Sequence, residues 1–377
     1  MAEPRANACA RQESRLFGAC RILLALGGIA LLWTTQGCAR PRRPIFEPID
    51  PPIAWPAHPA QPRIRYVGAL HSSEDLKAPR GLMRSLGDVL TGPPEPLRLY
   101  GPRALLCTAG GQRVWIADLG GRCLYLFDLA ERSCRRLRQF GDQPLMAPVD
   151  VCLGPRGTIY LCDAQQAAVH QIMENTGDWV ATVRLPEDIE RPVAITYREA
   201  KDELYVVDVK AHDVKVLTSD GSLLRLLGGR GAGPGTFNFP SDVVDDGQSL
   251  WVVDTGNHRV QRLGYDGVPL LIIGQEGDAP GDLAMPKSVA LDSEGHAYVV
   301  DARFENVQLF DQQGRLLLFF GEEGIGPGQF WLPAGIFIDS RDRIWVCDSY
   351  NARVQVFQYL KPEAASDDVV RDEPRIR

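Results

Sequence analysis

A short segment that ends in aspartate recurs six times along the chain at nearly constant spacing. Each copy combines aromatic and β-branched residues before the aspartate, as residues 250–254 (LWVVD) do. The six aspartates are Asp118, Asp163, Asp208, Asp254, Asp301 and Asp348, and the intervals between them are 45, 45, 46, 47 and 47 residues. A repeat of about 40 to 50 residues built from short strands is typical of the blades of a β-propeller.

Within each repeat the residues predict four antiparallel strands. A short apolar strand follows an opening proline, the segment that ends in aspartate is the second strand, and the third alternates apolar and polar side chains, as residues 354–357 do. The fourth follows a Gly or Asp turn, as in residues 316–320. The opening prolines are Pro102, Pro148, Pro192, Pro240, Pro286 and Pro333. The pattern predicts an all-β fold, a six-bladed propeller of four-stranded antiparallel blades.

The two ends of the repeat region indicate how the ring closes. The sixth repeat has three strands and is followed by a charged tail, residues 361–377, for which disorder is predicted. A spare strand, residues 63–70, precedes the first repeat. We expect this strand to dock as the outer strand of the last blade, so that the propeller spans residues 63–360 and leaves no large open edge. Deleting residues 63–70 should then cost far more stability than deleting residues 362–377.

Glycine-rich stretches, residues 228–240, 274–286 and 321–333, recur in step with the repeats. They look superficially like phosphate-binding loops, but none ends in Gly-Lys-Ser or Gly-Lys-Thr. We interpret them as linkers from the outer strand of one blade to the inner strand of the next. Phe237, Leu283 and Phe330 in these linkers are predicted to pack between blades.

The first 38 residues predict export. Four arginines precede a 12-residue apolar run, residues 22–33, which is too short to span a bilayer at about 20 residues. Cys38 directly follows Gly37, so the segment resembles a bacterial lipoprotein signal, in which this cysteine is acylated and becomes the mature N-terminus. Thr35 stands where such signals usually have leucine, and ordinary cleavage to a soluble secreted protein is the alternative. By that resemblance, Ala39 after the cysteine favours the outer membrane of a bacterial cell envelope.

Residues 39–62 are rich in proline and predict a semi-rigid tether. Residues 40–62 in polyproline conformation would extend roughly 70 Å. Removing residues 1–38 takes away four arginines and two glutamates, which moves the net charge from −7 to −9. This acidic balance, without a basic cluster, disfavours nucleic acid as a partner.

Six cysteines remain after Cys38. They are Cys107, Cys123, Cys134, Cys152, Cys162 and Cys347, and they form neither a C-x-x-C pair nor a zinc-ligand spacing. Cys162 and Cys347 stand directly before a repeated aspartate, where other repeats have valine or alanine. We therefore interpret them as small buried hydrophobic residues, although an oxidising compartment would permit disulfides.

The motif after the repeated aspartate identifies a resemblance. Residues 255–261 (TGNHRVQ) and 349–355 (SYNARVQ) resemble the NHL repeat, and the resemblance extends with weaker copies over residues 63–360. It implies a six-bladed propeller. It does not imply one activity, because NHL-type rings include protein-binding modules, RNA binders, sensor domains and a zinc-dependent amidating lyase.

Two sets of residues are candidates for a role at the ends of the strands. The six repeated aspartates are predicted to be structural and to accept hydrogen bonds from the following turn or from an arginine five residues on. The loops that follow them differ between blades, and variable loops on a rigid scaffold usually carry binding residues. The binding-face candidates are Arg122, Gln166, His212, His258, Arg303, Phe304, Tyr350 and Asn351.

An enzymatic alternative would need convergent metal ligands. The resemblance to the amidating lyase implies zinc ligands that are histidines from different blades. Here only His212 and His258 occupy equivalent positions, and a third ligand is not evident. A calcium site made of carboxylates that face the channel is a further alternative. No cofactor is expected under the main hypothesis, with calcium or zinc under the alternative, and the metal-binding residues are unknown.

One connection departs from the repeat. Residues 71–100 contain a stretch near residues 82–90 whose apolar side chains share one helical face, bounded by Pro and Gly. This helix is predicted to cover an opening or a groove of the ring, or to dock a partner. Together the sequence favours a monomeric, lipid-anchored, non-catalytic binding or scaffolding module for an envelope protein or other envelope ligand. A metal-dependent hydrolase or lyase that uses the channel is the alternative.

Overall fold

A computed structural model of the chain describes residues 44–57, 59–76 and 95–361. The signal segment with Cys38, the predicted helix at residues 82–90 and the tail from residue 362 lie outside the described residues. The described residues, all from Pro44 onward, belong to one compact unit. No helix in these described ranges is long and apolar enough to cross a membrane.

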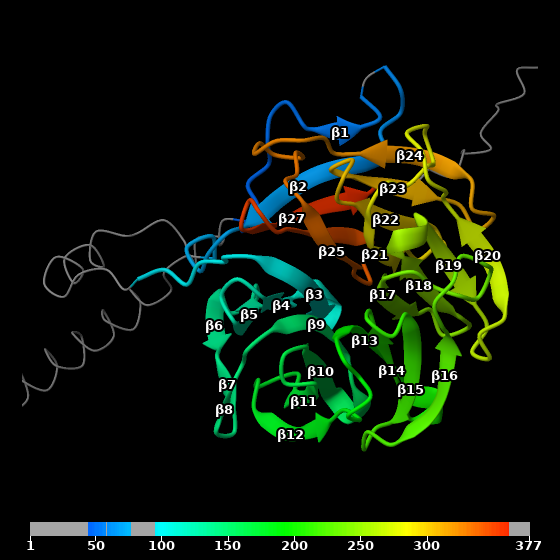
Figure 1. Cartoon of the computed structure of the whole chain (residues 1–377). Helices are drawn as coiled ribbons and strands as arrows, with labels where there is room; N and C mark the ends of the chain where they lie inside the picture. Colours follow the sequence, from blue (N-terminus) through cyan, green and yellow to red (C-terminus); the bar gives the residue numbers. More distant parts are fainter. Residues whose placement is uncertain (1–43, 58, 77–94, 362–377) are drawn as a thin grey trace, which may run out of the picture. The chain divides into compact units, whose positions relative to one another are not determined.

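Six sheets are arranged as blades around a central channel (Figure 1). Blade 1 contains β3 (Pro102–Thr108), β4 (Arg113–Asp118), β5 (Cys123–Asp128) and β6 (Ser133–Leu137). Blade 2 contains β9 (Pro148–Leu153), β10 (Thr158–Asp163), β11 (Ala168–Met173) and β12 (Trp179–Arg184). Blade 3 contains β13 (Pro192–Arg198), β14 (Glu203–Asp208), β15 (Asp213–Thr218) and β16 (Leu223–Gly228).

The remaining blades follow the same order. Blade 4 contains β17 (Pro240–Asp245), β18 (Leu250–Asp254), β19 (Arg259–Leu263) and β20 (Pro269–Ile273). Blade 5 contains β21 (Pro286–Leu291), β22 (Ala297–Asp301), β23 (Asn306–Phe310) and β24 (Leu316–Phe320). Blade 6 contains β25 (Pro333–Ile338), β26 (Arg343–Asp348) and β27 (Arg353–Tyr359). A short hairpin of β7 (Gln139–Phe140) and β8 (Gln143–Pro144) joins blades 1 and 2, and single 3-10 turns lie at Ala109–Gly111, Pro155–Gly157, Glu199–Lys201 and Thr255–Asn257.

Blade 6 is completed from the other end of the chain. Strand β2 (Ile64–Leu70) pairs antiparallel with β27, with Ile64 opposite Tyr359 and Leu70 opposite Val354. In Figure 1 the blue strand β2 lies beside the red strand β27. The predicted closure by the strand at residues 63–70 is therefore confirmed. The sheet order is β1-β2-β27-β26-β25, so the last blade has a fifth, outermost strand, β1 (Ala54–Trp55).

The segment before β2 lies against the ring, although its sequence is that of a tether. The Phe46 ring packs edge-on against Trp345, with 6.2 Å between ring centroids, and occupies the space that a side chain at Gly68 would need. The Trp55 ring lies 5.8 Å from the rings of both Phe320 and Phe357. The side chains of Ile45, Phe46 and Trp55 are partly buried here, because contact with blade 6 removes part of their surface from water. The structure thus places residues 44–57 on the propeller.

The core lies between blades. The side chains of Phe237, Leu283 and Phe330 are fully buried, as the sequence predicts for the linkers. Phe237 packs directly over Gly228, which has a φ of +82° and no room for a Cβ. Glycine meets both conditions, since it adopts a positive φ without steric cost.

The six cysteines of the described residues are free thiols. Cys107, Cys123, Cys162 and Cys347 are buried, and for Cys162 and Cys347 this agrees with their interpretation as small hydrophobic residues. Burial raises the pKa of the Cys107 and Cys162 thiols well above the usual value.

Candidate binding site at one mouth of the channel

The register of the innermost strands defines two faces of the ring. Each opening proline pairs with the aspartate that ends the second strand, as Pro102 does with Asp118 and Pro240 with Asp254. The loops after these aspartates and the linkers into the opening prolines therefore lie on the same face, here called the loop face. The turns between first and second strands lie on the opposite face, here called the turn face.

The six repeated aspartates fix the loop face. Each is fully buried, and each accepts hydrogen bonds from backbone N–H groups of the preceding linker. Asp118, for example, accepts bonds from the N–H groups of Tyr100 at 2.7 Å and Gly101 at 2.9 Å. In blade 6 the Arg353 Nε also donates to Asp348 at 2.7 Å. The carboxylates thus hold linkers and loops to the blades and are unavailable to a ligand.

The two candidate histidines join neighbouring blades. His212 is buried, its Nδ1 accepts the Phe239 N–H at 2.9 Å, and its ring packs on Phe239 with 4.5 Å between centroids. His258 Nδ1 lies 2.8 Å from the carbonyl oxygen of Ala284 in the following linker. Both histidines have a positive φ in their loops. Their Nδ1 atoms are engaged in contacts between blades, and the structure does not bring the two rings together as one site.

The other candidate residues divide into braced and exposed side chains. Gln166 Nε2 donates to the Pro144 carbonyl at 2.6 Å and to Asp163 at 3.1 Å. Asn351 Nδ2 donates in the same way to the Gly324 carbonyl at 2.8 Å and to Asp348 at 2.9 Å. The exposed residues Arg122 and Arg303, the half-buried Phe304 and the exposed Tyr350 complete the set. Of the eight candidates, Tyr350 lines a cavity on this face.

This cavity, here called the mouth cavity, has a volume of about 600 Å³ and is formed by blades 1, 5 and 6. Tyr100, Leu119, Met285, Leu332 and Tyr350 contribute apolar surface, and Arg103 and Lys287 contribute charge. The Trp331 ring packs against Tyr350, with 5.7 Å between centroids, and is itself exposed. The sequence did not single out Arg103 and Lys287, because each directly follows an opening proline on a strand that reads as core.

A pair of carboxylates lies one residue deeper along the channel. Asp150 on β9 accepts the Ile195 N–H at 2.7 Å, and Asp242 on β17 accepts the Ser288 hydroxyl at 2.6 Å. Both residues line a second, smaller cavity of about 220 Å³ that the innermost strands of all six blades surround. Burial, and next the charge of Asp242, raise the pKa of Asp150 to about 8. Burial raises the pKa of Asp242 as well, so the two buried carboxyls titrate as a pair.

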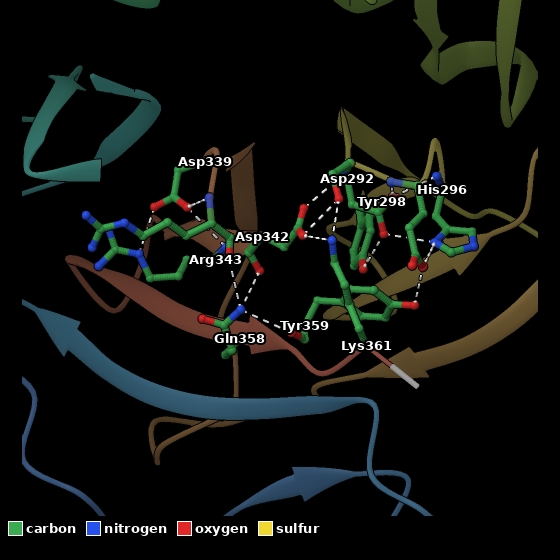
Figure 2. Close-up of polar contacts among 12 residues, drawn as sticks. Asp292, His296, Tyr298, Asp339, Asp342, Arg343, Gln358, Tyr359 and Lys361 are labelled. Carbon is green, nitrogen blue, oxygen red and sulfur yellow. Dashed lines mark hydrogen bonds and ion pairs between the residues drawn. The ribbon is translucent and has the colours of Figure 1, made fainter. Parts of the chain in front are cut away.

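On the turn face, Asp292, Glu294 and His296 bring three possible metal-ligand atoms within 4.8 Å of one another. Their contacts are already made within the protein (Figure 2). His296 Nδ1 lies 2.9 Å from Asp292 Oδ2, and the Tyr359 hydroxyl donates to Glu294 at 2.8 Å. The neighbouring Ser293 backbone and hydroxyl bond Asp342, which also pairs with Lys361 at 3.0 Å. The cluster braces the turn of blade 5 against blade 6.

Comparisons with known proteins agree with this architecture. The NHL repeat family matches residues 237–263 and 330–357, in blades 4 and 6. An auxiliary nutrient binding protein from Bacteroides thetaiotaomicron superposes with a TM-score of 0.55 at 15% identity, covering 70% of each chain. An auxiliary nutrient binding protein from Bacteroides ovatus superposes with a TM-score of 0.54 at 13% identity, again covering 70% of each chain. No curated protein sequence matches the chain.

An enzyme shares the fold as well. Virginiamycin B lyase from Staphylococcus aureus superposes with a TM-score of 0.50 at 14% identity, covering 69% of this chain and 95% of the lyase. At these identities the likeness establishes the fold alone. The chain is thus a six-bladed β-propeller with NHL repeats, and its activity has to be argued from its own surface.

Proposed function

We propose that the chain is a lipid-anchored β-propeller of a bacterial cell envelope that acts as a non-catalytic binding module. The observation that carries this proposal is the mouth cavity on the loop face. Its volume lies within the range of small-molecule sites, about 300 to 1,000 Å³, and its walls combine apolar surface with a few charged groups. The ligand enters from solvent on the face where the loops vary between blades.

The rim of the cavity supports a binding role. Tyr100, Tyr350 and Trp331 are 60%, 64% and 48% exposed, so three large aromatic side chains gather at one mouth. Tyrosine and tryptophan offer a large contact area at a low cost in conformational entropy and are enriched at binding hot spots. A surface of this kind suits an envelope protein or a ligand within the envelope.

The envelope location rests on the signal segment. Gly37 and Cys38 after a short apolar run favour acylation of the cysteine, and Ala39 favours the outer membrane. We expect Cys38→Ser to abolish incorporation of labelled palmitate in a bacterial host and to move the protein from the membrane fraction to the soluble fraction. Membrane association that persists unchanged in Cys38→Ser would contradict the anchor.

Site-specific photocrosslinking in intact envelopes tests the binding face. A photoreactive residue at Tyr350 should capture one defined ligand or protein, because position 350 borders the mouth cavity. The matched control is Leu224, which is 49% exposed on the outer strand β16, away from the cavity. The proposal fails if both positions give the same products, or if position 350 gives none while the protein is present and folded.

The carboxylate pair in the channel favours one second candidate, a metal-dependent hydrolase or lyase. Asp150 and Asp242 are the kind of oxygen donors that bind calcium. If this function holds, the mature protein purified without chelator retains about one equivalent of calcium or zinc by plasma mass spectrometry. The double variant Asp150→Asn, Asp242→Asn would then lose it. If neither the unsubstituted protein nor the double variant retains calcium or zinc, this candidate function is rejected.

A further inference from the structure

We propose that the mouth cavity binds a small organic anion, whose oxyanion group lies between Arg103 and Lys287 and whose apolar body lies against Tyr100 and Tyr350. The inference deepens the proposed function and rests on it, because it names the chemical class of the ligand at the same face. The shared chemistry is that of a carboxylate or phosphate attached to an apolar group.

The positions of the two cations are equivalent. Arg103 follows Pro102 on β3 of blade 1, and Lys287 follows Pro286 on β21 of blade 5. Blade 6 lies between these two blades, because β25 contacts both β21 and β3. Its residue at the same position is Ala334, which also lines the cavity. A small side chain flanked by two cations leaves space between them for a group of opposite charge.

The charge of Arg103 acts at longer range on the channel carboxyls of Asp150 and Asp242, and that of Lys287 on Asp301, but neither cation has a direct partner within the described residues. Neither side chain makes a hydrogen bond or an ion pair there, although both are partly withdrawn from water. The nearby aspartates are already used, since Asp118 bonds the linker of blade 1 and Asp301 the linker of blade 5. Burial, and next the charge of Arg103, lower the pKa of Lys287. A bound anion would remove this repulsion and supply the missing partner.

The remaining walls define what the anion is attached to. Tyr100 and Tyr350 border the opening, and Met285 and Leu332 line the cavity between them. Such a lining favours an aromatic or aliphatic body over a bare inorganic ion, because burial of apolar area adds to the charge-assisted contact. The planar guanidinium of Arg103 suits carboxylate and phosphate alike, since it donates two parallel hydrogen bonds to either.

Calorimetry on residues 39–377, the chain without its signal segment and anchor cysteine, tests the inference with four probes. Benzoate and phenyl phosphate carry both the apolar body and the charge, inorganic phosphate carries the charge alone, and benzyl alcohol carries the body alone. We expect binding of benzoate or phenyl phosphate that is at least tenfold tighter than binding of the other two probes. Whichever of benzoate and phenyl phosphate binds more tightly identifies the head group of the ligand as a carboxylate or a phosphate.

Two variants assign the binding to the cation pair. Arg103→Met and Lys287→Met keep an apolar stem and remove the charge, and each should weaken the binding of the preferred probe by about 10-fold or more. The control is Arg156→Met, an exposed arginine of the turn face, which should leave the affinity unchanged. In the absence of ligand, Lys287→Met should also raise the melting temperature, because it removes a partly buried charge that is repelled by Arg103. A side chain with a merely structural role would not give this combination.

The outcomes separate this inference from the proposed function. No measurable binding of benzoate and phenyl phosphate, or binding that survives both substitutions unchanged, overturns the anion site. If position 350 still captures a defined partner by photocrosslinking in that case, the loop face remains a binding surface for another class of ligand. If the probes do not bind and position 350 captures no partner, the proposed function is rejected together with the inference.

Discussion

The closure strand β2 allows the stability of the ring to be tested with single substitutions. Ile64 and Leu70 are fully buried at its two ends. Leu70 belongs to the apolar cluster between blades 6 and 1, and Ile64 to the cluster between blades 5 and 6. Replacing either by alanine removes buried methyl groups and leaves a cavity, which costs about 2 to 5 kcal/mol.

The double variant should approach complete unfolding. The two side chains are about 20 Å apart along the strand, at about 3.3 Å per residue, so their effects should add. The expected sum is about 4 to 10 kcal/mol, against a total stability of about 5 to 15 kcal/mol for a typical domain. We therefore expect Ile64→Ala, Leu70→Ala together to lower the urea midpoint far more than either substitution alone.

Urea unfolding followed by tryptophan fluorescence measures these losses. The matched control is Arg65→Ala, because Arg65 lies on the same strand but is exposed, and its loss should stay within about 0.5 kcal/mol. Deletion of residues 362–377 should likewise leave the midpoint unchanged. The reasoning is refuted if Ile64→Ala and Leu70→Ala unfold at the same urea concentration as Arg65→Ala.

Three further predictions concern buried ionisable groups. Arg353→Met leaves the Asp348 carboxylate buried without its cation and should lower the free energy of unfolding by about 3 to 5 kcal/mol in urea titrations; a loss below about 1 kcal/mol contradicts the structural role of this pair. The pKa of Asp150 is about 8 in the folded state and about 4 in the unfolded state, so the folded state holds the proton more tightly. The stability that this protonated carboxyl contributes is therefore complete below about pH 4 and is lost as the pH rises through 8. Urea midpoints measured from pH 5 to 9 should fall with pH, and Asp150→Asn should flatten that slope whatever its absolute stability; an equal slope rejects the assignment. Iodoacetamide at pH 8 should leave Cys107 and Cys162 unmodified in the native protein and modify both in urea, since burial keeps these thiols protonated, and rapid native labelling would show that they are accessible.

The repeat made most of the fold predictable from sequence. A fixed spacing between aspartates and opening prolines determines the blades, and the missing strand of the sixth repeat points to residues 63–70. The linker residues Phe237 and Phe330 were predicted as core because they recur with the same period. Residues 44–57 carry no such signal, because β1 has two residues and lies among prolines. Their packing depends on the shape of blade 6, which the local sequence does not encode.

The candidate site was less accessible to sequence reasoning. Loop position identifies which residues lie on a face, but not where their side chains point. Gln166 and Asn351 turn inward to brace linkers, and the His212 ring contacts the next blade. Arg103 and Lys287 gain significance only because blades 1 and 5 flank a small residue in blade 6. Blades 1 and 5 are far apart in sequence and flank blade 6 only in the closed ring, so the local sequence does not reveal that the two cations lie on either side of Ala334.

The closure of blade 6 also sets an order of events in time. Blades 1 to 5 each pair strands that are near neighbours in the sequence, so they can form as soon as their own residues have emerged. Blade 6 must wait, because Ile64 pairs with Tyr359, 295 positions later. Contacts so distant in sequence are slow to form, since a long loop has to close first. Strand β2 therefore remains without its partner until the last repeat has been synthesised, and the apolar side chains of Ile64 and Leu70 need protection from aggregation during that interval.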